Sequence, residues 1–322
     1  MDIVIPWVDG SDPRHQSKRE SYLPHQNDVL EEAVMPHRWR DNGELQFCLA
    51  SIERHAPWVG RIFIVTDEQT PGKMGHLLWK TRRKIEIIDH TVIFHGYEDA
   101  LPTFNSLSIG CVAWRIPDLS DEFILLNDDL FFAGQVQPED FFVDGKAVLR
   151  GSWQRVEDVE DRGIHKAAQV NASRLAGYNN GEFFSPAHVA HSIRRSTMAR
   201  LYEELRPEFE RNIAFRFRDP SQFSASTLHA HTAIKDRWYQ YAQEVDWYSL
   251  SIKNSRRPTK NAIKKKLTHL EGKKLGCVND MAAAREAYPK IADHLHSIAG
   301  VSRLPIYIRE LLSFVRLAKS RK

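Results

Sequence analysis

Short apolar runs alternate with amphipathic stretches through the first 130 or so residues of the chain. Four apolar runs predict strands at residues 3–9, 61–67, 84–90 and 122–129. Apolar residues at helical spacing predict helices at 42–57, with Asp41 or Asn42 as its cap, and at 103–117. Alternating strands and helices of these lengths predict an α/β fold with a mainly parallel sheet flanked by helices.

The pattern changes after residue 142. Residues 144–174 are polar with weak periodicity, and residues 185–205 predict a helix with Ser185 as N-cap and Pro186 at its first position. A further helix is predicted from about 220 to 244, and two more in the C-terminal third. We therefore predict an α/β core at 1–143, a helix-rich part at 144–300 and a C-terminal helix at 301–322.

Composition is typical of a soluble globular protein. The 322 residues are 42% hydrophobic and 27% charged, with a net charge of +3, which gives no argument for nucleic-acid binding. An acid at Asp2, the lack of a basic N-terminal region and the lack of a bilayer-length apolar stretch predict a cytoplasmic protein. Cys48 and Cys111 fall in predicted helices, which favours buried free thiols.

Carboxylates follow three of the four predicted strands. They are Asp9 and Asp12, Asp67, and the adjacent pair Asp128 and Asp129 in FILLNDDLFF. Open α/β sheets bind ligands at the carboxyl ends of their strands, and a buried carboxylate is costly unless it meets a cation or hydrogen-bond donors. The NDD segment is therefore predicted to hold Mg²⁺ or Mn²⁺, the alternative being a surface turn.

Two further Asp-bearing segments carry the same two interpretations. Asp9, Gly10 and Asp12 in DGSDP are candidates for contact with a nucleotide or a metal, or form an ordinary Asp-Gly turn. Asn279 and Asp280 in CVNDM follow a short apolar segment and are candidate metal ligands, or cap the helix that MAAAREAY predicts.

Two motifs supply candidate bases and phosphate ligands. His188 and His191 lie at i and i+3, which places them on one face of the predicted helix, where its positive N-terminus favours the neutral imidazole that a general base needs. The alternative is a pair of structural histidines, and a zinc site is disfavoured because no further Cys or His has ligand spacing. In FRFRDP, alternation places Arg216 and Arg218 on one side for phosphate binding, the alternative being a solvated edge strand.

Basic residues concentrate near the C-terminus. Residues 256–274 hold eight Lys or Arg and one acid, and residues 304–322 predict a helix with an apolar face and a basic remainder. Such a helix can lie on anionic lipid at the inner face of the membrane, or pack its apolar face on the core.

Several of these blocks together resemble the Stealth family, which includes bacterial capsular-polysaccharide phosphotransferases and the lysosomal GlcNAc-1-phosphotransferase precursor. The blocks are IPWVDGSDP, the long stretch from NGELQFCLASIERHAPW through LPTFNSLSIGC and FILLNDDLFF to PEDFF, then HVAH with RFR, and CVND. They cover well over half of the chain in the order found in the family.

The resemblance implies a GT-A-like nucleotide-sugar fold and transfer of a sugar-1-phosphate from a UDP-sugar (UDP-GlcNAc or a UDP-hexose) to a saccharide or lipid-linked glycan, with release of UMP. It implies that Mg²⁺ or Mn²⁺ is held by Asp128, Asp129, Asn279 and Asp280. The implied base is His191 or His188, with Arg218 on the phosphate. The implied donor-binding residues are Asp9, Gly10, Asp12, Asn105 and Arg218.

One residue departs from the family pattern. Family members commonly carry a glutamate in the helix after the LPTF segment, where this chain has Gly110. Two alternatives to the implied activity therefore stay open. One is a GT-A-type glycosyltransferase that releases UDP, and the other is a non-catalytic protein that binds polyanions or membranes.

Overall fold

The computed structural model describes residues 1–23, 29–35, 39, 41–72, 74, 77–159, 163–251 and 259–301. The predicted basic helix at 301–322, with its membrane contact, lies outside the described residues except for Val301. Within the described part, no helix is long and apolar enough to cross a membrane.

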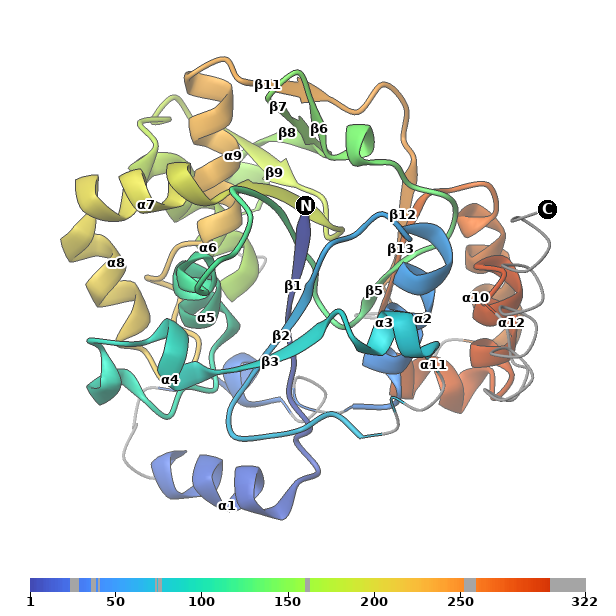
Figure 1. The fold of residues 1–322 in the computed structure, drawn as a ribbon. Helices are drawn as coiled ribbons and strands as arrows, with labels where there is room; N and C mark the ends of the chain where they lie inside the picture. Colours follow the sequence, from blue (N-terminus) through green and yellow to red (C-terminus); the bar gives the residue numbers. More distant parts are fainter. Residues whose placement is uncertain are drawn as a thin grey trace.

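A five-stranded sheet forms the centre of the molecule (Figure 1). Its strands, in spatial order, are β10 (His191–Arg194), β4 (Glu122–Leu125), β1 (Asp2–Pro6), β2 (Ile62–Thr66) and β3 (Ile85–Asp89). The last four are parallel, and β10 pairs antiparallel with β4 at one edge. The prediction of an α/β fold with a mainly parallel sheet is confirmed.

Alternate residues of the central strands supply two separate hydrophobic cores. Ile3 and Ile5 of β1 pack on one side of the sheet with α2 (Glu44–His55), whereas Val4 packs on the other side. That second core includes residues of α5 (Ser106–Val112), α7 (Arg195–Glu204), α8 (Arg206–Ile213) and α9 (Ala225–Lys235). Both faces are covered, because strands that are apolar on both sides must be buried on both (Figure 1).

The described residues form three smaller sheets besides the central one. They are β12 (Trp247–Ser251), β13 (Leu275–Asn279) and β5 (Leu130–Phe132); β11 (Tyr239–Tyr241), β7 (Lys146–Leu149) and β6 (Phe142–Val143); and β8 (Gly151–Arg155) with β9 (Glu182–Pro186). The remaining helices are α1 (Pro13–Tyr22), α3 (Trp79–Arg82), α4 (His90–Ile93), α6 (Ile164–Leu175), α10 (Lys260–Leu267), α11 (Met281–Ala287) and α12 (Ile291–Ile298).

The antiparallel pairing of β13 with β5 joins distant parts of the chain. Leu275 lies opposite Phe132, and Cys277 lies opposite Leu130. A Cβ on Gly276 would come within 2.4 Å of the Phe131 ring, so only glycine fits the close approach of these two strands. The pairing brings the CVND segment alongside the NDD segment.

The predicted helix at 185–205 is wrong in its first half. Ser185 and Pro186 end β9, and His191 begins β10, so that the helix starts only at Arg195. The backbone of β10 hydrogen-bonds to β4, and this tertiary pairing outweighs the local Ser-Pro capping signal. His188 and His191 therefore do not share a helix face.

Two other predicted elements are also corrected. The helix predicted at 220–244 is limited to α9 and is followed by β11. The FRFRDP segment is not a strand, since residues 214–224 form turns and irregular structure. The domain boundary at residue 143 stays a prediction, and β10, from beyond it, completes the central sheet.

Two buried histidines of α9 hold β9 and β10 in place. The Arg194 backbone N–H donates to His229 Nε2 at 2.8 Å, and the Phe184 N–H donates to His231 Nε2 at 3.0 Å. Burial lowers the pKa of His229 to about 3 and also lowers that of His231, so both rings are neutral acceptors. These contacts fix the two strands on either side of His188.

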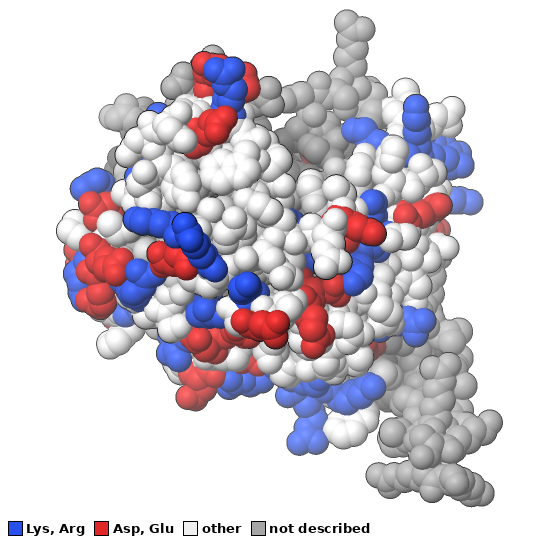
Figure 2. All heavy atoms as spheres, turned by 90° about the horizontal axis from the view of Figure 1, so that it is seen from above, with Lys and Arg blue, Asp and Glu red and all other residues white. Residues whose placement is uncertain are grey.

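Charged side chains of both signs are interspersed around one face of the molecule (Figure 2). Lys and Arg lie next to Asp and Glu along its edges, and a broad central area of this face carries few charges. Among the described residues on this face, no field of a single sign develops, in keeping with the net charge of +3.

Candidate active site

The turn between β4 and β5 carries the adjacent aspartates. Strand β4 ends at Leu125, the Leu126 N–H still donates to the Val4 carbonyl at 2.9 Å, and β5 begins at Leu130. Asp128 and Asp129 thus lie at the carboxyl edge of the parallel sheet, where open α/β sheets place ligands. The prediction that the strand stops at this segment is confirmed.

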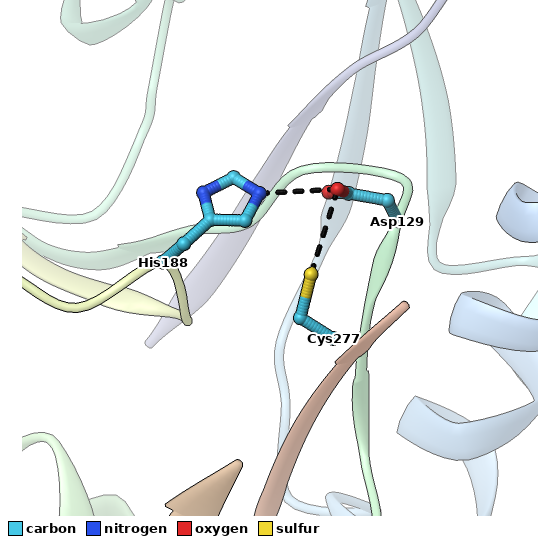
Figure 3. Close-up of side chains that lie close together, drawn as sticks. All are labelled: Asp129, His188 and Cys277. Carbon is cyan, nitrogen blue, oxygen red and sulfur yellow. Dashed lines mark hydrogen bonds and ion pairs between the residues drawn. The ribbon is translucent and has the colours of Figure 1, made fainter. Parts of the chain in front are cut away.

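Asp129 lies at the meeting point of three chain segments (Figure 3). Its Oδ2 is 3.0 Å from His188 Nε2 and 3.6 Å from Cys277 Sγ. Its backbone carbonyl accepts from the Val278 N–H at 3.2 Å, which ties the turn to β13. His188 comes from the loop between β9 and β10, so residues far apart in sequence surround one carboxylate.

The Asp129–His188 contact is an ion pair in this structure. Burial lowers the pKa of His188, but the Asp129 carboxylate outweighs burial and holds that pKa well above its usual value. Burial likewise raises the pKa of Asp129, and His188 more than offsets this, so that the pKa is lowered overall. Because an ionised carboxylate only accepts, Nε2 keeps its hydrogen, and Nδ1 is the nitrogen that is without a proton when the ring is neutral.

Asp128 belongs to a cluster of carboxylates. Burial raises its pKa well above the usual range, and the negative charges of Asp129, Glu44 and Asp41 add to the effect. Burial also raises the pKa of Glu44, which lies at the start of α2. Asp128 and Glu44, which resist ionisation, and the neighbouring Asp129 carboxylate together form a site that a cation would stabilise.

One oxygen of the Asp129 carboxylate is available to bind a further donor or cation. Its Oδ1 is buried and has no hydrogen-bond partner. A buried acceptor without a partner is costly, and a cation bound there would remove the cost. Together with the Asp128 carboxyl group, this oxygen supplies the hard donors that Mg²⁺ or Mn²⁺ prefers.

The CVND segment reaches the same edge through β13. Asn279 is the last residue of β13, and Asp280 caps α11, its side chain accepting from the Ala283 N–H at 3.0 Å. The alternative of a helix cap is thereby confirmed for Asp280. A metal contact for either residue stays a prediction, and capping uses only one of the two Asp280 carboxylate oxygens.

His191 lies on β10, opposite Leu125 of β4. Burial lowers its pKa to about 4, and the positive charges of His188 and Arg150 contribute. It is therefore a neutral imidazole, as predicted, but burial is the cause and not a helix N-terminus.

The DGSDP segment forms an internally bonded turn. Asp9 accepts from Ser11, and Gln69 bonds both the Asp9 backbone and the Asp12 carboxylate. Asp12 caps α1 by accepting from the Arg14 N–H. A Cβ on Gly10 would come within 2.3 Å of Trp39, so this glycine allows a close approach of two chain segments. These hydrogen bonds run within the turn and to Gln69, not to the Asp129 cluster.

Asn105 and Arg218 lie together at the start of α5, on the face of the sheet that α5 and α7 to α9 cover. The Asn105 amide is fully buried and donates to the Phe215 and Phe217 carbonyls at 3.0 and 2.9 Å. Arg218 donates to Ser106 at the start of α5. Asn105 therefore fixes the segment that carries Arg218, while Arg216 bonds backbone carbonyls before α5.

Two residues of the site were missed by sequence reasoning. Glu44 resembles any first-turn helix acid, and no local signal places it beside Asp128. Cys277 has a stronger signal, since it stands in the CVND segment, whose Asn279 and Asp280 are candidate metal ligands. All three cysteines are free and buried, and Cys277 alone contacts a carboxylate of the site.

Two family models match the chain. They are Stealth protein CR1, conserved region 1, over residues 1–26, and Stealth protein CR2, conserved region 2, over residues 38–149. The matches include the DGSDP turn, α2 and the NDD segment.

Curated relatives carry phosphotransferase names. The chain is 30% identical to the receptor polysaccharide phosphotransferase WefC of Streptococcus oralis over 69% of this chain and 74% of the relative. It is 34% identical to a capsular polysaccharide phosphotransferase of Actinobacillus suis over 66% of this chain and 57% of the relative. It is 40% identical to the capsular polysaccharide phosphotransferase cps12A of Actinobacillus pleuropneumoniae over 51% of this chain, and there it spans 43% of the relative.

Solved structures with a similar chain path include two glycosyltransferases. The galactosyltransferase LgtC has a TM-score of 0.46 at 14% identity, covering 96% of this chain and 99% of LgtC. Mouse xyloside xylosyltransferase 1 has a TM-score of 0.42 at 13% identity, covering 86% of this chain and 96% of that chain.

Proposed function

Because the chain belongs to the Stealth family, we propose that it is a transferase that passes a sugar-1-phosphate to a hydroxyl group during synthesis of capsular or other cell-surface polysaccharide. The donor is a UDP-sugar, UDP-GlcNAc or a UDP-hexose, and the acceptor is a saccharide or lipid-linked glycan. The products are a phosphodiester and UMP.

The observation that carries this proposal is the Asp129–His188 contact of 3.0 Å at the carboxyl edge of the sheet. Phosphoryl transfer needs a group that takes the proton of the attacking hydroxyl, close to the groups that hold the phosphates. Here the candidate base His188 is within hydrogen-bond distance of the candidate metal ligand Asp129.

The reaction forms one bond and breaks one. The acceptor oxygen attacks the phosphorus nearest the sugar, and the bond from that phosphorus to the bridging oxygen of UMP breaks. From the neutral ring, His188 would take the hydroxyl proton at Nδ1, because Asp129 holds the hydrogen on Nε2. His191, a neutral imidazole on the neighbouring strand, is the second candidate for this role.

A hard divalent cation, Mg²⁺ or Mn²⁺, would neutralise the diphosphate charge when bound. Asp128 and Asp129, with Asn279 and Asp280, would hold it, and the partnerless Asp129 Oδ1 fits that role. With the Asp129 charge compensated, the pKa of His188 would fall toward the range in which the ring can accept a proton.

Positive charge and positioning come from other parts of the chain. Arg218, held near α5 by the turn that Asn105 fixes, would bind phosphate of the donor. Asp9, Gly10 and Asp12 would face the nucleotide from the end of β1. The preformed bonds of their turn make this a rigid contact.

The test is the identity of the released nucleotide. The protein is incubated with a panel of UDP-sugars, Mg²⁺ or Mn²⁺ and an oligosaccharide acceptor, with the Asp129→Asn variant as control. Release of UMP by the native chain and not by the variant is expected. Release of UDP would establish a glycosyltransferase instead, and no release from any donor would favour the non-catalytic alternative raised by Gly110.

A further inference from the structure

Asp129, His188 and Cys277 present one oxygen, one nitrogen and one sulfur donor to a common point (Figure 3). All three donor atoms lie within 4.8 Å of one another. The oxygen is 3.0 Å from the nitrogen and 3.6 Å from the sulfur.

These separations suit a tetrahedral thiophilic cation. Zinc bonds of about 2.0 to 2.3 Å at tetrahedral angles place neighbouring donor atoms about 3.4 to 3.5 Å apart. The oxygen therefore lies within a few tenths of an ångström of that spacing from both other donors. The nitrogen and the sulfur lie within 4.8 Å of each other, so that rotation of the His188 or Cys277 side chain would complete the triangle.

The chemistry of the donor set differs from that of a magnesium site. Mg²⁺ and Mn²⁺ select oxygen ligands, whereas a thiolate and an imidazole together select zinc and its neighbours in the first transition row. Cys277 is the distinguishing residue, because it is fully buried and its sulfur points at the Asp129 carboxylate.

The triangle is open on one side. The Asp129 and His188 side chains are 24% and 30% exposed, whereas Cys277 closes the floor of the site. Three protein ligands with one accessible position are the arrangement of an open zinc site, in which water or a ligand takes the fourth place.

We propose that Asp129, His188 and Cys277 bind a thiophilic divalent cation of the zinc class. This cation is distinct from the hard cation of the transfer reaction and shares Asp129 with it. Zinc at the triangle occupies both Asp129 and His188. On the proposed function, zinc therefore inhibits the transfer in competition with Mg²⁺ or Mn²⁺.

Cobalt spectroscopy tests the site without any need for turnover. Co²⁺ is titrated into metal-stripped protein, and a thiolate-to-cobalt charge-transfer band with intense tetrahedral ligand-field bands is expected at one equivalent. Zn²⁺ should abolish these bands at one equivalent, whereas Mg²⁺, which shares Asp129, should weaken them only at large excess.

Matched variants assign the ligands. Cys277→Ser should lose the charge-transfer band and weaken zinc binding by at least about 100-fold. Cys48→Ser and Cys111→Ser, which remove the other buried thiols, should keep it. His188→Gln is a second ligand variant at a partly exposed position, and it should change the ligand-field bands while the thiolate band stays.

The outcomes separate this inference from the proposed function. Absence of the thiolate band in the native chain, or its persistence in Cys277→Ser, overturns the zinc-class site even if UMP is released. A band that behaves as expected in a chain that releases no UMP supports the site and overturns the proposed transfer alone.

Discussion

Because the buried His229 ring resists protonation in the folded state, the protein should lose stability in mild acid. The ring is fully buried, and its Nε2 accepts the Arg194 N–H at 2.8 Å. A proton on Nε2 would remove that acceptor and place a charge beside the Arg194 side chain. Burial and the Arg194 charge accordingly lower the pKa of His229 from 6.5 to about 3.

The sign of the effect follows from linkage. Above pH 6.5 the ring is neutral in both states, and the full stability is present. As the pH falls below about 6.5, His229 becomes protonated in the unfolded chain, whereas in the folded chain it stays neutral down to about pH 3. The free energy of unfolding therefore falls as the pH falls. Between about pH 7.5 and about pH 5, one such histidine removes roughly 2 kcal/mol.

The size of this stability loss hardly depends on the pKa of His229 in the folded state. Any pKa at or below about 4 gives nearly the same loss by pH 5, since the loss is then set by the unfolded chain. Carboxylates with lowered pKa values, such as Asp2 and Asp89, act at lower pH, and groups with raised pKa values, such as Asp128 and His188, act in the opposite sense but cancel when two chains that share them are compared. His191, with a pKa of about 4, adds a similar slope.

Urea unfolding at a series of pH values measures the effect. In His229→Gln the side-chain carbonyl can accept the Arg194 N–H and does not titrate. Its stability should therefore fall by roughly 2 kcal/mol less than that of the native chain over this range. Equal slopes for His229→Gln and the native chain would refute the reasoning.

Three substitutions test other contacts. Asp246→Ala leaves the buried Arg150 without the carboxylate that accepts two of its hydrogen bonds, at 2.8 and 2.6 Å. The free energy of unfolding in urea should therefore fall by roughly 3–5 kcal/mol. A loss below about 1 kcal/mol would contradict this. Gly110→Ala adds a Cβ that meets nothing within 4 Å inside α5 and should raise the melting temperature, through about 0.5–1 kcal/mol of added stability. An unchanged or lower melting temperature would argue against the open space. Gly276→Ala places a methyl group 2.4 Å from the Phe131 ring and should cost about 1–3 kcal/mol, measured by thermal unfolding; native-like unfolding would show that β13 can move aside.

The central sheet was predictable because its strands are marked in their own residues. Each predicted parallel strand overlaps one of β1 to β4, since an apolar run bounded by turn residues needs no distant partner to be recognised. The position of Asp128 and Asp129 followed from the same pattern, because a buried run that meets two carboxylates has to end.

The segment around His188 was not predictable by the same means. Ser185, Pro186 and the following apolar spacing are a sound helix signal, yet the backbone bonds of β10 to β4 decide the structure there. Those bonds join residues about seventy positions apart, and no local pattern expresses them. Cys277 reached Asp129 in the same way, through the pairing of β13 with β5.

The pairing of β5 with β13 also has a consequence for the order of events during synthesis. Asp129 and Cys277 are 148 residues apart, and closing a loop of that length costs roughly 4 kcal/mol of chain entropy. A nascent chain that has emerged as far as α9 can complete the central sheet and the second core, because all five strands and helices α5, α7, α8 and α9 are then present. That chain still lacks β13 and with it Cys277, so the site is complete only after the last third of the chain has been synthesised. During synthesis, the core can therefore fold before the site is complete.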